Sequence, residues 1–137
     1  MARLFLTVFI SIFVVLSGFI DARPPVQHQL SDVKKYSGNA TYYDPSRGAC
    51  GFLSNGDELV CAIADSLYDT QTIDGNPNNN KFCQKQISVT GPKGTVIVTV
   101  VDRCGSCKDV DLDLSRPAFN KIGDPINGRV PVTWYFI

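Results

Sequence analysis

The side chains that could do chemistry in this chain are mainly cysteines and aspartates. The 137 residues include five cysteines and a single histidine, His28. His28 lies in a stretch rich in proline and glutamine, before any periodic segment. The sequence therefore excludes Ser-His-Asp and Cys-His triads as well as histidine-rich metal sites. We expect no metal and no other cofactor.

Cys104 and Cys107 have the C-x-x-C spacing of redox motifs. No helical pattern follows them, and the next carboxylates are Asp109, Asp111 and Asp113. Nearby carboxylates raise the pKa of a thiol and so disfavour a reactive thiolate. A structural disulfide that closes a short loop is the favoured interpretation. A zinc site of four cysteines is disfavoured because the chain has only one close cysteine pair.

The N-terminal residues predict a removable secretion signal. Residues 1–3 form a short basic start, residues 4–20 are nearly all apolar, and Ala22 offers a cleavage position. A membrane anchor is the alternative, because the apolar run nearly reaches the minimum length of a membrane span. We expect a signal peptide over residues 1–22 and a flexible lead-in over residues 23–35. A secreted protein would retain disulfides, most simply two bridges and one leftover thiol.

The charge balance limits the partners that the protein can have. The chain carries 13 Lys+Arg and 13 Asp+Glu, so its formal net charge is zero. A chain without net positive charge is not attracted to the phosphates of a nucleic acid or to an anionic membrane surface. We therefore expect neither a nucleic acid nor a membrane as partner. The length supports one domain. We expect a monomer.

Short strands are the elements that must position these side chains. Apolar alternation and turn residues predict a hairpin at residues 91–94 and five strands, at residues 36–43, 58–64, 85–90, 95–101 and 129–137. In the fourth strand, Val96, Val98 and Val100 share one face. Residues 115–123 read as a short helix with Ser115 as its N-cap, and residues 65–69 as one helical turn. A mainly-β barrel with one or two short helices follows, because a barrel leaves no exposed strand edges.

An ordered set of motifs resembles a known family. The segments run GNATYY at 38–43, GACG at 48–51, VVDRCGSC at 100–107, DLDLSRPAF at 111–119 and VTW at 132–134. Their order resembles the RlpA-like double-psi β-barrel proteins over residues 36–137. The chain looks most similar to single-domain secreted fungal members, which are expansin-like, loosenin-like or papain-inhibitor-like; barwin and family 45 glycoside hydrolases are more distant. The resemblance implies a six-stranded double-psi barrel.

The same resemblance implies a polysaccharide site. In the expansin-like pattern, the positions that match Asp102, Asp113 and Thr41 lie together in an open groove. A glycosidic oxygen needs a protonated carboxyl as acid, and a nearby second carboxylate raises the pKa of that acid. Asp102 could instead be a turn residue and Asp113 a cap of the following helix. Asn39 is the acceptor of the only N-glycosylation sequon, and a glycan there would lie near the groove.

Aromatic side chains could stack on sugar rings in that groove. The candidates for substrate binding are Tyr42, Tyr43 and Phe52. Tyr42 and Tyr43 alternate along one strand, so at most one of them faces the groove. Trp134 is favoured as a core residue, since a small barrel needs large side chains to fill it.

The resemblance also bears on the cysteines. It implies a disulfide between Cys50 and Cys83, and the sequence spacing permits a second one between Cys104 and Cys107. Cys61 lies inside an apolar strand, where an unpaired thiol would act as a small hydrophobic side chain.

Three functions are compatible with these residues. The first is an expansin- or loosenin-like protein that binds cellulose, chitin or another glucan of the cell wall and loosens it without efficient hydrolysis. Asp44, which precedes Pro45, reads as a turn residue rather than the water-activating base of a hydrolase. The second is an inhibitor of a papain-like protease or an apoplastic effector, which would use the loops at residues 52–57 and 69–80. The third is a lytic transglycosylase or an endoglucanase-like enzyme.

Overall fold

The computed structural model describes residues 32–137. The expected signal peptide at residues 1–22 and most of the lead-in at residues 23–35 lie outside this range. Within residues 32–137, no helix has the length and apolar character needed to cross a membrane.

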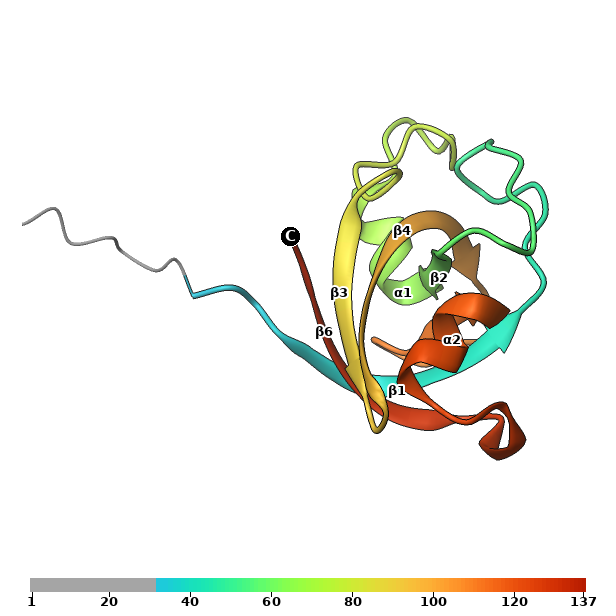
Figure 1. The fold of residues 1–137 in the computed structure, drawn as a ribbon. Coiled ribbons are helices and arrows are strands. Elements are labelled where there is room, and N and C mark those ends of the chain that lie inside the picture. The colour runs from blue at the N-terminus through green and yellow to red at the C-terminus, as the bar shows by residue number, and fades with distance from the viewer. Residues whose placement is uncertain (1–31) are drawn as a thin grey trace, which may run out of the picture.

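Six strands close into a barrel, which confirms the expected fold class (Figure 1). The strands are β1 (Tyr36–Tyr43), β2 (Val60–Ala64), β3 (Gln86–Gly91), β4 (Gly94–Cys104), β5 (Leu112–Ser115) and β6 (Val130–Phe136). Around the barrel they follow the order β1-β5-β2-β4-β3-β6. The short helices are α1 (Asp65–Tyr68) and α2 (Arg116–Ile122), with single 3₁₀ turns η1 (Asp69–Gln71) and η2 (Pro125–Asn127).

Two parallel pairings distinguish this barrel from a simple meander. Strand β1 pairs in parallel with β5, and β2 pairs in parallel with β4. The other four pairings are antiparallel, including the hairpin of β3 and β4 in which Gly91 lies opposite Gly94. Parallel strands need long crossover connections, so segments far apart in the sequence become neighbours here.

Most elements lie where the sequence predicts them, with one exception. The hairpin, the strand from Tyr36 to Tyr43 and the helix after Ser115 all form. The strand β5 was not predicted individually, because its four residues LDLS alternate apolar and polar over too short a run. Its Leu112 and Leu114 are fully buried, while Asp113 between them is only partly buried.

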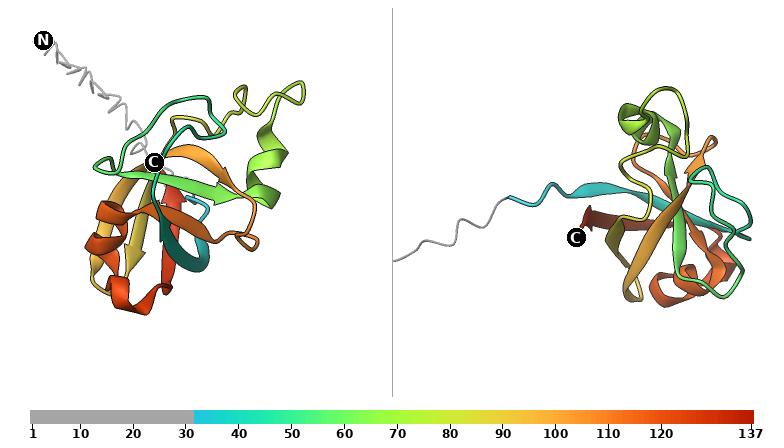
Figure 2. Two further views of the ribbon diagram at one scale, coloured as in Figure 1. Left: turned by 90° about the vertical axis from the view of Figure 1, so that its right-hand side faces the viewer. Right: turned by 90° about the horizontal axis from the view of Figure 1, so that it is seen from above.

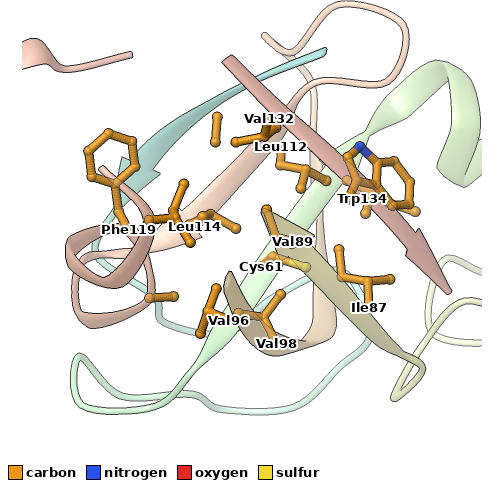
Figure 3. Packing of buried hydrophobic residues seen from close by; sticks show 14 of the residues in the cluster. Cys61, Ile87, Val89, Val96, Val98, Leu112, Leu114, Phe119, Val132 and Trp134 are labelled. Atoms are coloured by element: carbon orange, nitrogen blue, oxygen red, sulfur yellow. The ribbon is translucent and has the colours of Figure 1, made fainter. Parts of the chain in front are cut away.

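The interior of the barrel is apolar and well filled (Figure 3). Trp134 is fully buried and stacks on Tyr36 with 4.2 Å between ring centroids. Its indole Nε1–H donates a 2.9 Å hydrogen bond to the carbonyl of Val110, so the polar end of the ring is satisfied. Trp134 is therefore a core residue.

The cysteines pair as expected. Cys50 bonds to Cys83 and Cys104 bonds to Cys107, while Cys61 is a buried free thiol. The first bridge joins the loop after β1 to the segment before β3. The second joins the last residue of β4 to Cys107, three residues further along the chain.

Helices and loops gather at different ends of the barrel. In Figures 1 and 2, α2 and η2 lie at the same end as the tip of the β3–β4 hairpin. The long loops that follow β1 and α1 lie at the other end, beside α1.

Candidate functional site

Four side chains from four strands form one row on the outside of the barrel. Thr41 on β1 pairs with Asp113 on β5, Asp113 pairs with Ala62 on β2, and Ala62 pairs with Asp102 on β4. Directly paired residues point to the same side of a sheet. We call Thr41, Asp113, Ala62 and Asp102 the acidic row. It brings together the three candidates Thr41, Asp102 and Asp113.

Asp102 reaches this row because the pairing of β2 and β4 is irregular. Cys61 pairs with Val100 but Ala62 pairs with Asp102, so Val101 has no partner in the ladder. Strict alternation would place Asp102 on the core side with Val100. An extra residue in one strand re-aims the side chains that follow it. Here the extra residue turns Asp102 outward.

The carboxyl of Asp113 lies in a partly buried environment. Thr41 Oγ1 donates a hydrogen bond of 2.8 Å to Asp113 Oδ1. Burial raises the pKa of Asp113, and the charge of Asp102 raises it slightly further, while the Thr41 hydrogen bond and Arg129 oppose the rise. The direction agrees with the expectation for an acid, but burial is the main cause, ahead of repulsion between the two aspartates.

Asp102 is held by backbone amides of a neighbouring loop. Its Oδ1 accepts hydrogen bonds of 2.7 Å from the N–H groups of Ala49 and Arg103. Its Oδ2 accepts none from the described residues and can meet a ligand. Gly48 packs tightly here, because a Cβ on it would overlap the Val101 carbonyl and lie 3.0 Å from the Cβ of Asp102. Gly48 and Ala49 are site residues that the sequence did not single out individually.

Tyr43 is the aromatic candidate that accompanies the acidic row. It lies two residues after Thr41 and therefore on the same face of β1. Burial raises the pKa of its phenol, and the negative charges of Asp102 and Asp113 raise it further. The phenol is therefore neutral and close enough to both carboxylates to feel their charge, and it can act as a hydrogen-bond donor.

Two other candidates lie apart from the row. Tyr42 points to the opposite side of β1, packs on Phe119 of α2 and donates a hydrogen bond to the carbonyl of Pro125. Asp44 is exposed and pairs with Arg116 at 3.5 Å; the Arg116 guanidinium also lies over the ring of Tyr42. Asp44 thus belongs to the α2 side of the strand.

Phe52 lies at a separate hollow. This hollow has a volume of about 370 Å³ and is lined by Phe52 together with residues of its own loop and of β2 and β4. A second hollow of about 540 Å³ lies over β1, β3 and β6. Neither includes Thr41, Asp102 or Asp113, so the acidic row does not form the floor of either hollow.

Asn39 borders the acidic row. Ala40 points into the core, so Asn39 and Thr41 both face outward on β1. The backbone N–H of Asn39 donates a 2.7 Å hydrogen bond to Asp111 Oδ1, and the Arg129 guanidinium donates one of 2.8 Å to Asp111 Oδ2. A glycan on Asn39 would lie on the same face of β1 as Thr41, two residues away along the strand.

No metal centre accompanies these groups. Residues 32–137 contain no group of three or more His, Cys, Asp or Glu side chains arranged to hold a metal ion. The acidic row and the neighbouring Tyr43 together offer hydrogen bonding and acid–base chemistry, through Thr41, Asp113, Asp102 and the Tyr43 phenol.

Comparison with known proteins gives the family and two kinds of relative. The family model described as "Lytic transglycolase" (DPBB_1) matches residues 35–134. A papain inhibitor from Streptomyces mobaraensis is 32% identical over 125 residues, which cover 88% of this chain and 85% of that protein. The solved structure of a Streptomyces papain inhibitor matches with a TM-score of 0.68 and 32% identity, over 77% of this chain and 97% of that one.

The second kind of relative is an expansin. A mutant expansin from Clavibacter michiganensis, solved in complex with cellohexaose, matches with a TM-score of 0.64 and 29% identity. The match covers 76% of this chain and 50% of that one, so this chain spans half of that expansin's length.

Proposed function

Since this chain belongs to the RlpA-like double-psi β-barrel family, we propose that it is an expansin-like protein that binds and loosens cell-wall polysaccharide without efficient hydrolysis. One observation carries this proposal: Thr41, Asp113 and Asp102 lie in a single row across four strands. The similarity to an expansin that was solved with cellohexaose supports it.

The row is suited to compete for hydrogen bonds between packed glycan chains. Asp102 Oδ2 accepts no hydrogen bond from the described residues and is available as an acceptor, and the neutral phenol of Tyr43 is a donor. Burial raises the pKa of Asp113, which favours the protonated form that can also donate. A sugar hydroxyl can both donate and accept, so a chain lying along the row exchanges interchain hydrogen bonds for bonds to the protein. Loosening of this kind needs no bond cleavage.

The direction of the carboxylates argues against efficient hydrolysis. Asp102 and Asp113 flank Ala62, so their Cα atoms are two strand spacings apart, about 10 Å. Both project from the same face and approach a bound chain from the same side. Inverting hydrolysis needs a base that activates water on the opposite face of the sugar ring, and Asp44 lies on the α2 side.

We further propose that the protein acts outside the cell. The apolar N-terminal segment and the two disulfides support this location. The glycan is cellulose, chitin or another wall glucan, and the mature domain comprises residues 36–137.

The test measures wall weakening and sugar release with the same preparations. Wild-type protein should swell or weaken insoluble wall material and release little reducing sugar. Asp102→Asn should lose this effect, whereas the matched variant Asp44→Asn should retain it. Robust sugar release that Asp44→Asn abolishes would instead make the protein a hydrolase.

A second candidate function is inhibition of a papain-like cysteine protease. The observation that favours it is the match to a papain inhibitor over 85% of that inhibitor's sequence and 97% of the solved inhibitor chain. A barrel of this kind would use surface loops rather than the acidic row to bind a protease. Inhibition of papain by wild type and Asp102→Asn alike would support this function.

A further inference from the structure

We propose that residues 47–54 and 69–80 form one rigid surface that docks into the substrate cleft of a papain-like cysteine protease, with Phe52 and Leu53 as anchors. We call these two segments the two-loop surface. The proposal rests on the second candidate function and adds the surface, its anchors and the part of the protease that they contact.

The two-loop surface presents large apolar side chains to solvent. Phe52 is 51% exposed and Leu53, next to it, is 72% exposed. Ile73 in the second segment is also exposed. Single exposed apolar side chains are common, but neighbouring ones on one turn are typical of interaction sites. Aromatic and aliphatic side chains that enter a partner's pocket usually carry much of the binding energy.

Residues 47–54 are fixed by hydrogen bonds within the segment. Arg47 and Leu53 form an antiparallel bridge, and the Gly48 N–H donates to the Phe52 carbonyl at 3.1 Å. The Arg47 guanidinium donates to the carbonyl of Gly51 at 2.9 Å. The anchors are therefore presented on a closed turn, which lowers the entropy lost on binding.

The turn is also attached to the barrel. Cys50 donates its N–H to the carbonyl of Val101 and forms the disulfide with Cys83. The carbonyl of Val101 is free for this bond because Val101 has no partner in the ladder. The backbone beneath the anchors is thus fixed covalently and by hydrogen bonds.

Tyr68 connects the two segments from below. Its ring is fully buried, and its hydroxyl lies 3.4 Å from the sulfur of Cys50 and 3.2 Å from that of Cys83. The same hydroxyl donates a 2.7 Å hydrogen bond to the carbonyl of Pro77 in the second segment. Gly51, with a φ of +83°, packs on Asn78: a Cβ there would lie 3.0 Å from its side chain.

The second segment has its own hydrogen-bond network. Asn80 is 7% exposed, and its side-chain amide donates to the carbonyl of Tyr68 and to the hydroxyl of Thr72. Asp74 accepts hydrogen bonds from the Asn76 backbone and the Asn79 side chain. The asparagine-rich sequence therefore forms a closed loop rather than a loose one.

A concave protease cleft is the partner that fits these features. The anchors are exposed apolar side chains beside a hollow of their own surface, so a partner that covers them must offer apolar side-chain pockets. Preorganised protease inhibitors bind with little backbone change. The two-loop surface lies at the end of the barrel opposite α2 and η2, where no described element covers it (Figures 1 and 2).

Inhibition of papain by single variants tests the anchors. The inhibition constant should rise about tenfold or more in Phe52→Ala and in Leu53→Ala. The control is Ile126→Ala, because Ile126 is 88% exposed in η2 at the opposite end. Its inhibition constant should match that of wild type. Urea denaturation of all four proteins checks that they remain folded.

A second measurement tests the cleft. Papain whose cleft is filled by a covalently attached peptide inhibitor should not bind the wild-type protein. Tight binding to this blocked papain would overturn docking in the cleft. If wild type inhibits papain and both anchor variants inhibit equally well, the two-loop surface is wrong while the second function remains. If wild type neither binds nor inhibits papain, both fail.

Discussion

Thr41 and Asp113 lie opposite each other on parallel strands, and the Thr41 hydroxyl donates a 2.8 Å hydrogen bond to the Asp113 carboxylate across 72 residues of sequence. This bond favours the ionised form of Asp113, whereas burial favours the protonated form. Burial and the Thr41 hydrogen bond therefore act on the pKa of Asp113 in opposite directions, and the hydrogen bond can be removed separately.

Removing the hydroxyl should raise the pKa of Asp113 further. Thr41→Val keeps the shape of the side chain but loses the donor, so the free energy of unfolding near pH 7 should fall by about 1–3 kcal/mol. Thr41→Ser keeps the donor and should leave the pKa near that of wild type. An NMR titration of the Asp113 carboxyl carbon measures both variants. Equal pKa values in Thr41→Val and Thr41→Ser would contradict the role of the bond.

Asp113 should make the protein less stable as the pH rises. Because its folded-state pKa is raised, the folded state holds its proton more tightly than the unfolded state. Its contribution is fully present below the unfolded value of about 3.9 and is lost as the pH rises through the folded pKa. The stability difference between wild type and Asp113→Asn should therefore decrease across that window and then level off. Urea denaturation of both proteins from roughly pH 3.5 to 7 measures this stability difference. A stability of wild type relative to Asp113→Asn that increased with pH would refute the prediction.

Gly48→Ala should damage the acidic row through the loop that holds Asp102. The added methyl would overlap the Val101 carbonyl and crowd Asp102, so the loop must move away from β4. That movement would break the hydrogen bond from Ala49 to Asp102. We expect a loss of about 1–3 kcal/mol of stability, as for other overpacked sites, and a loss of wall loosening. Gly56→Ala is the control, because a Cβ on Gly56 meets nothing within 4 Å.

Cys61 should be chemically inert in the folded protein. It is fully buried, and burial raises the pKa of its thiol, so little thiolate forms at neutral pH. A thiol reagent at pH 8 (roughly the pKa of a free thiol) should label Cys61 only after the protein unfolds. Cys61→Ser should cost more stability than Cys61→Ala, about 1–3 kcal/mol, because the serine hydroxyl would be buried without a designed partner. Rapid labelling of the native protein would contradict this.

The sequence predicted the barrel better than it predicted the details of the site. Hydrophobic alternation and turn residues located the long strands and the hairpin, because those signals are local. The outward direction of Asp102 depends on an unpaired Val101, which only the pairing of β2 with β4 reveals. Alternation alone would have placed Asp102 with Val100 on the core side.

Tertiary contacts give Ser115 a different role from the helix cap that the local sequence predicts. It occupies the N-cap position of α2 as predicted, but its side chain makes no capping bond. Its hydroxyl donates instead to the carbonyl of Glu58 at 2.6 Å and accepts from the N–H of Val60. Strand β5 is too short for its pattern to be read, and long-range pairing with β1 and β2 creates it.

The two parallel pairings also determine when the acidic row can exist during folding. Its members come from β1, β2, β4 and β5, and joining β1 to β5 closes a loop of most of the domain. Loop-closure entropy delays such contacts, and barrels rich in them fold in about milliseconds to seconds. The local β3–β4 hairpin can form much earlier. Nascent or misassembled chains would thus form strands and loops before Asp102 and Asp113 lie in one row. Polysaccharide affinity would therefore be a measure of the fully assembled barrel and not of a collapsed intermediate.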